Sequence, residues 1–317
     1  MQRIILSVAV FMLGQAISLA AECNIMDRDN FISGGKKEPV LLANGKSDSD
    51  PGIILFKSGL RVNTDGAPNS YHPNDLQGKT LAINNICNGI SVKDLSTGKF
   101  VSCPKARTVF GQFRDSDWNV PSGFRISWQN VLAARNENGR TIPCVFRQGD
   151  FKGYFGSLTS LKNGLSGNDA GECEAKNQLD QRFVPALVLA GGSNVLKTFG
   201  ARKGDLVLAH NPANGITQAA VIGDFGPPDN IGEGSVALNI ALLKKTDQPK
   251  TYDEAKKLDT GSQEILVAII PKSASFELKR PYAAGNLSER VGSWAKANGY
   301  NDTAGLQVLM RTCEPFL

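Results

Sequence analysis

Residues 219–243, AAVIGDFGPPDNIGEGSVALNIALL, hold the pattern from which the fold of this 317-residue chain is best deduced. The small and branched apolar residues at 219–222 predict a buried strand. The Gly-Pro-Pro at 226–228 then predicts a turn, because proline lacks the amide hydrogen that a strand ladder needs. Ser235 is suited to cap a short, mostly buried helix over 236–243. The stretch therefore predicts a strand, a sharp turn and a helix in succession.

Two carboxylates flank this turn. Asp224 stands at the end of the predicted strand, and Glu233 lies between Gly232 and Gly234. Cleavage of a glycosidic bond needs a proton donor on the leaving oxygen and a second carboxylate that activates water or attacks carbon. Glycines beside the acids leave room for a polymer to approach the backbone. A plainer interpretation also fits, in which Asp224 caps a turn and Glu233 is a solvated charge.

Local context suggests a role for each acid. Asp224 follows an apolar strand, where burial would raise its pKa, so we expect it to donate the proton. Glu233 precedes a helix N-terminus, which favours a negative charge, so we expect it to act as the base.

The same residues resemble a known family. Gly223-Asp224 and the IGEGS box at 231–235 are similar to the catalytic segment of the glycoside hydrolase family 75 chitosanases. A second match runs from Lys57 through the TDGAP turn at 64–68 to Tyr71. Together the two matches cover about residues 53–72 and 183–243.

The resemblance implies a double-psi-like β-barrel core and endo-hydrolysis of β-1,4 glucosamine linkages with net inversion. It implies that Asp224 and Glu233 are the essential acids. It also implies that Asp65, Tyr71 and Lys57 contact a polysaccharide substrate such as chitosan. No cofactor is expected.

The box also resembles the signature of double-psi β-barrels that include lytic transglycosylases and expansin-like wall proteins. Two alternatives therefore stay open. One is cleavage of peptidoglycan by a muramidase or a lytic transglycosylase, and the other is a non-catalytic carbohydrate-binding barrel.

The N-terminus predicts a secretory signal peptide. Arg3 precedes an apolar run over 4–13, and small residues follow at 18–20, so we expect cleavage after Ala20. Polar residues interrupt the run too early for a membrane anchor, and no later segment is long enough to span a bilayer. The sequence thus predicts a secreted or periplasmic protein with a single catalytic domain over 21–317 and an insertion at about 90–180.

The chain has six cysteines, an even number that predicts disulfides in an exported protein: Cys23, Cys87, Cys103, Cys144, Cys173 and Cys313. Six cysteines allow 15 pairings, so the connectivity stays open. No Cys-x2-Cys pair occurs and only two histidines exist, so we expect no metal site.

The formal net charge is +5, without a long basic run or interleaved aromatic residues, which argues against a nucleic-acid partner. A chitosan-cleaving enzyme must hold a polycation in an acidic cleft, whereas a peptidoglycan enzyme approaches an anionic wall. The mildly positive net charge of the chain slightly favours the peptidoglycan enzyme.

The rest of the chain predicts a β-rich α+β fold in which a disulfide-stapled insertion interrupts a barrel core. Residues 22–51 suggest an irregular arm, and 153–171 a loop. Helices are expected at 128–135 and 286–298, and residues 306–310 lead to Cys313, whose disulfide would hold the C-terminus. Further strands are expected at 53–56, 60–63, 81–86, 100–103, 142–146, 184–190, 206–209, 216–222, 264–270 and, more weakly, 275–278.

Overall fold

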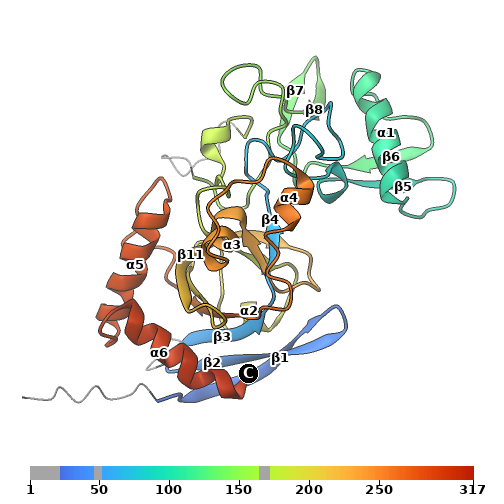
Figure 1. Cartoon of the computed structure of the whole chain (residues 1–317). Helices are drawn as coiled ribbons and strands as arrows, with labels where there is room; N and C mark the ends of the chain where they lie inside the picture. The colour runs from blue at the N-terminus through green and yellow to red at the C-terminus, as the bar shows by residue number, and fades with distance from the viewer. Residues whose placement is uncertain (1–21, 46–51, 164–171) are drawn as a thin grey trace, which may run out of the picture.

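The computed structural model describes residues 22–45, 52–163 and 172–317, so the predicted signal peptide lies outside the described residues. The chain is mixed α+β and rich in strands, with one nine-stranded sheet and two two-stranded sheets among these residues (Figure 1). This confirms the expected β-rich α+β class.

The main sheet has the strand order β1-β2-β3-β13-β10-β11-β9-β12-β4. Its outer hairpin is β1 (Ile25–Ser33) and β2 (Lys36–Ala43), which pairs with β3 (Ile53–Ser58). The irregular arm expected over 22–51 is therefore wrong for the described part of that range. Its polar composition hid the hairpin, because most of β1 is exposed and the buried residues of β2, Val40, Leu41 and Ala43, gather at its C-terminal end.

The other strands of the sheet are β4 (Arg61–Asn63), β9 (Ala186–Ala190), β10 (Leu206–Asn211), β11 (Ile216–Gly226), β12 (Glu233–Ser235) and β13 (Ile265–Ile270). The predicted β10–β11 hairpin is confirmed. Only Gly59 and Leu60 separate β3 from β4, so one bent segment contributes both the third strand and the last strand of the order. The sheet therefore curls, but its pairing within the described residues does not close into a barrel.

The sheet is buried on both faces. Along β10, Leu206 and Leu208 join one apolar cluster, whereas Val207 and Ala209 join another. A strand covered on both sides reads as a continuous apolar run, which explains why β10, β11 and β13 were predictable.

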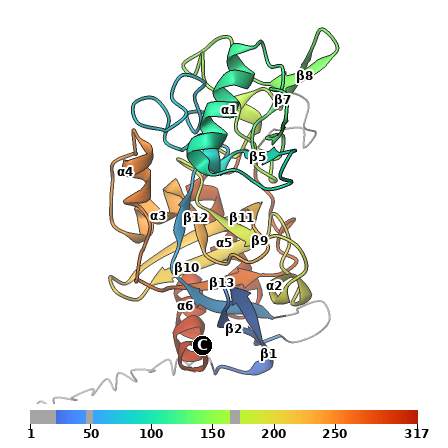
Figure 2. The same ribbon diagram turned by 90° about the vertical axis from the view of Figure 1, so that its right-hand side faces the viewer.

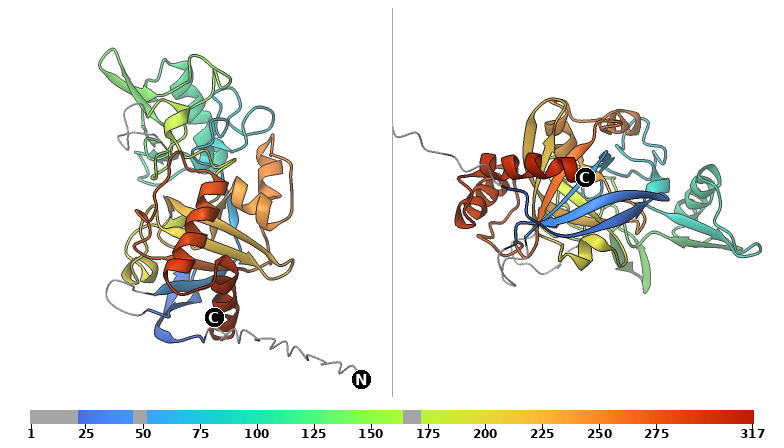
Figure 3. Two further views of the ribbon diagram at one scale, coloured as in Figure 1. Left: turned by 90° about the vertical axis from the view of Figure 1, so that its left-hand side faces the viewer. Right: turned by 90° about the horizontal axis from the view of Figure 1, so that it is seen from below.

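Helices cover the two faces. On one face pack α5 (Ala284–Ala297) and α6 (Thr303–Cys313), as Figure 3 shows. Contacts from α2 (Val195–Thr198) and α3 (Val236–Leu242) reach the other face. The predicted helices at 236–243 and 286–298 are confirmed within two residues at each end, whereas α6 was not predicted.

The insertion forms a separate apolar cluster at one end of the sheet (Figure 2). Its elements are η1 (Ile86–Asn88), β5 (Ser91–Asp94), α1 (Cys103–Asp115), β6 (Phe124–Ser127), β7 (Ala134–Glu137), β8 (Arg140–Pro143) and η2 (Ala175–Asn177). Near it lies α4 (Tyr252–Lys256), and η3 (Glu314–Phe316) ends the chain.

Several local expectations for the insertion are wrong. Residues 81–85 are turns and bends rather than a strand, residues 100–103 lead into α1, and residues 128–135 form a turn that leads into β7. No strand forms at 275–278. The expected strand at 142–146 overlaps β8 only at its start. Short apolar runs do not distinguish strand from helix, and here contacts with distant residues decide the outcome.

Three disulfides confirm the expected use of the cysteines. Cys23–Cys313 ties the first hairpin to α6, across a sequence separation of 290 residues. Cys87–Cys103 and Cys144–Cys173 both lie within the insertion. Of the helices in the described ranges, none has the length and apolarity needed to traverse a bilayer.

Candidate active site

Strand pairing brings the two predicted acids to opposite sides of β9. Val188 of β9 pairs with Asp224 of β11 on one side and with Glu233 of β12 on the other. Residues in direct register on neighbouring strands point to the same face of a sheet. The side chains of Asp224 and Glu233 therefore share a face, with one strand between them.

The backbone of β11 at Gly226 passes close to the side chains of Glu233 and Val188. A Cβ added to Gly226 would lie 3.5 Å from Glu233 Oε2 and 3.1 Å from Val188 Cγ1. A side chain at position 226 would therefore be tight against Val188 and in ordinary van der Waals contact with the carboxylate. Glycine at this position relieves the contact with Val188.

Asp224 is partly buried, and one of its carboxylate oxygens accepts three hydrogen bonds. Its Oδ1 accepts hydrogen bonds from Ser160 N at 3.0 Å, Ser160 Oγ at 2.6 Å and Phe225 N at 2.8 Å. Burial nevertheless raises the pKa of Asp224, against the effect of these donors. The direction agrees with the expectation of a raised pKa.

Glu233 is surrounded by donors. Asn63 Nδ2 donates to Oε2 at 3.3 Å, Asn230 Nδ2 donates to Oε1, and the Arg61 guanidinium lies 3.8 Å from Oε1. Each of these groups interacts favourably with a negative charge. The surroundings of Glu233 thus suit a carboxylate.

Asp65 follows β4 and lies in the same cluster. Burial is the main reason that the pKa of Asp65 is raised to about 8, and the charges of Asp224 and Glu233 raise it further. The Tyr71 hydroxyl donates to Asp65 Oδ1 at 2.8 Å, which acts in the opposite direction. The structure therefore brings three carboxyls together, two of which hold their protons more tightly than usual.

A cavity of about 670 Å³ opens beside these acids. Its volume lies within the usual range for ligand sites. Its lining combines acids, amides, two aromatic rings and two basic side chains. These residues include Asp65, Glu233, Asp259, Asn63, Asn84, Asn88, Phe225, Tyr252, Arg61 and Lys256.

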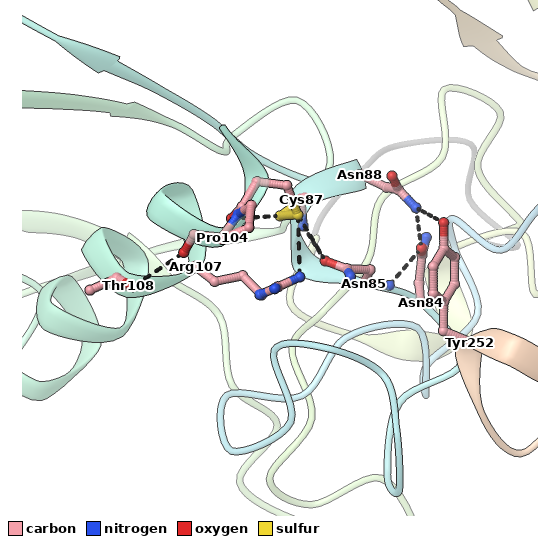
Figure 4. The surroundings of a disulfide bond; sticks show 9 residues. Asn84, Asn85, Cys87, Asn88, Pro104, Arg107, Thr108 and Tyr252 are labelled. Atoms are coloured by element: carbon pink, nitrogen blue, oxygen red, sulfur yellow. Dashed lines mark hydrogen bonds between the residues drawn. A yellow bond between two sulfur atoms is a disulfide. The ribbon is translucent and has the colours of Figure 1, made fainter. Parts of the chain in front are cut away.

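Hydrogen bonds connect the wall of this cavity to α4. Asn84 Nδ2 donates to Tyr71 Oη at 2.8 Å, and Asn88 Nδ2 donates to Asn84 Oδ1 at 2.7 Å and to Tyr252 Oη at 3.2 Å. Figure 4 shows Asn84, Asn88 and Tyr252 next to the Cys87 disulfide. Sequence reasoning did not single out these three residues, although the two neighbouring asparagines before Cys87 offered a weak signal.

Lys57, predicted to bind substrate, lies apart from this cavity. Its Nζ is 3.8 Å from Glu264 Oε2 and 3.9 Å from Glu314 Oε1, and it lines a different depression with Gln263. The other predicted residues, Asp65, Tyr71, Asp224 and Glu233, gather at one place. Tyr71 is buried, so it contacts Asp65 rather than the surface.

The described ranges contain no group of three or more His, Cys, Asp and Glu side chains placed to hold a metal ion. The chemistry available from the cluster is proton transfer between carboxyls, water and a substrate. Comparison of the chain with protein-family models and with curated proteins finds no match.

Proposed function

We propose that this protein is a glycoside hydrolase that cleaves β-linked amino-sugar polymers, with chitosanase-like endo-hydrolysis of β-1,4 glucosamine linkages. The main support is that Asp224 and Glu233 face the same side of the sheet, each opposite Val188. The cavity beside them supplies amides and rings of the kind that hold a sugar chain.

We propose net inversion because the chitosanase resemblance implies it, and the strand order is compatible with it, since β9 lies between Asp224 and Glu233. Neighbouring strands lie about 4.8 Å apart, so the Cα atoms of Asp224 and Glu233, two strands apart, are separated by about 10 Å. Inverting glycosidases hold their carboxyls about 6.5 to 9.5 Å apart, which leaves room for a water molecule. Retaining enzymes need a shorter gap of about 5 Å.

The three carboxyls have two catalytic roles, general base and general acid, and we call the candidates for each role the base side and the acid side. Glu233 with its three donors is the base that activates water. The acid side contains two carboxyls with a raised pKa, Asp224 and Asp65. Hydrolysis requires one group on each side in the correct protonation state.

We further propose that the curled sheet is a double-psi-like β-barrel. The continuity of β3 and β4 through Gly59 and Leu60 supports this, because one short segment supplies both the third and the last strand of the order. Three disulfides are typical of proteins that fold in an oxidising compartment. With the leader-like residues 1–20, they support export to the periplasm or the medium.

The test is release of reducing ends from chitosan, chitin and peptidoglycan in parallel. We expect cleavage of an amino-sugar polymer by the wild type and at least a 10²-fold loss in Glu233→Gln, since general acid–base catalysis contributes that much. Asp224→Asn should also lose activity, because Asp224 belongs to the same cluster of carboxyls. Glu264→Gln, outside the cavity, is the control and should keep wild-type activity. Full activity in either acid variant contradicts the proposal.

Cleavage of peptidoglycan is the second candidate. Arg61 and Lys256 line the cavity, and positive charge there suits an anionic wall polymer better than a polycation. 1,6-anhydro products from purified wall would identify a lytic transglycosylase. Binding of polymer by the clean wild type without turnover would instead indicate a carbohydrate-binding protein.

A further inference from the structure

The acid side of the cluster contains two carboxyls, and their surroundings differ. Asp65 lines the cavity together with Glu233. Asp224 is not among the residues that line it, and its Oδ1 already accepts three hydrogen bonds. Asp65 is therefore the better placed of the two to meet a bound sugar.

A directional chain of hydrogen bonds ends at Asp65. The backbone N–H of Asn85 donates to Asn84 Oδ1 at 2.8 Å, and a backbone amide can only donate. This identifies the oxygen of the Asn84 side chain, so its Nδ2 is the atom that donates to Tyr71 Oη at 2.8 Å. The orientation of the Asn84 amide is thus fixed by its neighbours.

The same chain fixes the hydrogen of Tyr71. Tyr71 is buried, and within the described part of the chain its hydroxyl forms hydrogen bonds with Asn84 Nδ2 and Asp65 Oδ1. A buried hydroxyl hydrogen left without an acceptor is costly, so the hydrogen goes to Asp65 Oδ1. A proton held by Asp65 then sits on Oδ2, and the Asn63 side chain, which also reaches Glu233, is the second hydrogen-bond partner of the Asp65 carboxyl.

We infer that Asp65 is the catalytic acid, and that its Oδ2 gives the proton to the leaving glycosidic oxygen. Asp224 is then a positioning residue that acts through its charge. This inference rests on the proposed function. The high pKa of Asp65, raised by burial and then by Asp224 and Glu233, supports it, and Tyr71 is the other titratable group in contact.

The proposed step balances. The Oδ2–H bond of Asp65 breaks as the proton joins the leaving oxygen and the bond between C1 and that oxygen breaks. Glu233 takes one proton from a water molecule whose oxygen bonds to C1. Asp65 ends as a carboxylate and Glu233 as an acid, and exchange with solvent restores both.

The test uses glycosides that differ in their leaving group. A natural sugar needs a proton to leave, whereas dinitrophenolate leaves without one. We expect Asp65→Asn to lower kcat/KM for the polymer at least 10²-fold, but less than tenfold for a dinitrophenyl glycoside of the same sugar. Its pH profile on that glycoside should lose the basic limb. Glu233→Gln should lower kcat/KM on both substrates.

The opposite pattern overturns the inference. If Asp224→Asn spares the dinitrophenyl glycoside and Asp65→Asn lowers both substrates equally, Asp224 is the acid. If the wild type cleaves neither, the proposed function fails. Carboxyl ¹³C NMR titration then still decides where the proton sits, and an Asp65 that is ionised at pH 6 contradicts the inference even when the enzyme is active.

Discussion

The protonation of Asp65 depends on two neighbours that act in opposite directions. The charge of Asp224 raises the pKa of Asp65, whereas the hydrogen bond from Tyr71 lowers it. We predict that Asp224→Asn lowers the pKa of Asp65 and that Tyr71→Phe raises it. Carboxyl ¹³C NMR titration of Asp65 measures both shifts and needs no substrate.

Asp205→Asn is a matched control for this pair. Asp205 is buried, and burial raises its own pKa to about 6, but its carboxylate accepts from the backbone of Arg202 and Ala274, and the charges that shift the pKa of Asp65 are those of Asp224 and Glu233. The titration of Asp65 should not change in that variant. Shifts of the same sign in Asp224→Asn and Tyr71→Phe would disprove the opposed roles.

Asp65 also links stability to pH. Because its pKa rises from 3.8 to about 8 on folding, the folded state binds this proton more tightly than the unfolded state. Its contribution is present below about pH 4 and is lost as the pH rises to about 8. We predict that Asp65→Asn does not show this pH-dependent fall in the free energy of unfolding. At pH 9 the variant should be more stable than the wild type by about 2 kcal/mol, since the folded wild type adjusts in part to the charge on Asp65.

Denaturant unfolding at pH 5 and pH 9 measures this effect. The wild type should lose more stability between the two values than Asp65→Asn does. An equal loss in both proteins would show that Asp65 titrates normally in the folded state.

At the residue scale, the sequence predicted the acids but not their partners. Asp224 and Glu233 were recognisable from the glycines and prolines around them, and Asp65 from its turn. Ser160 and Asn84 reach Asp224 and Tyr71 across 64 and 13 residues of chain, respectively. Nothing in the local sequence marks a polar residue that acts through such a contact, because only the fold creates it.

At the scale of elements, the junction of β12 and α3 holds Glu233 in place. A Cβ at Gly234 would meet the side chain of buried Asn239 and would lie 3.3 Å from Leu238 Cδ2 and from Leu60 Cδ1. Asn239 cannot move aside freely, since its Nδ2 donates to the carbonyls of Leu60 and Leu258. We predict that Gly234→Ala destabilises the protein by about 1–3 kcal/mol, as crowding in a packed core does.

Gly285→Ala is the control for that substitution. Gly285 lies in the first turn of α5 with nothing within 4 Å of an added Cβ. Alanine favours a helix over glycine, so this variant should be unchanged or more stable by up to about 1 kcal/mol. Thermal unfolding of both variants gives the comparison, and equal stability of the two would show that the space at Gly234 is not limiting.

The elements that could be predicted share one property. The strands β10, β11 and β13 are buried on both faces, so their apolar runs are unambiguous. The β1–β2 hairpin and α1 were missed because their sequences are mostly polar and a minority of their residues meets the core. Their structure follows from what they pack against, which a local pattern does not contain.

At the scale of the whole molecule, the cysteine count predicted disulfides, but only the fold reveals which residues they join. Cys23–Cys313 closes a loop of nearly the whole chain, whereas Cys87–Cys103 closes one of 16 residues. In the chain-entropy account, the short loop is worth about 3 kcal/mol and a loop of 100 residues about 4.7 kcal/mol. The long bond should therefore contribute more to stability.

Loss of the short disulfide should lower activity more than loss of the long one, because the short disulfide borders the cavity. Cys87 lies in η1 with Asn88, and Asn85 caps η1 by accepting from Cys87 N at 3.0 Å (Figure 4). We predict that the paired Cys87→Ser and Cys103→Ser variant loses kcat/KM at least tenfold while still folded, because Asn84 and Tyr71 no longer orient Asp65. The paired Cys23→Ser and Cys313→Ser variant should unfold at a lower temperature yet keep wild-type kcat/KM below that temperature. If the long bond proved to control activity and the short one only stability, the η1 wall would have no part in positioning the acid.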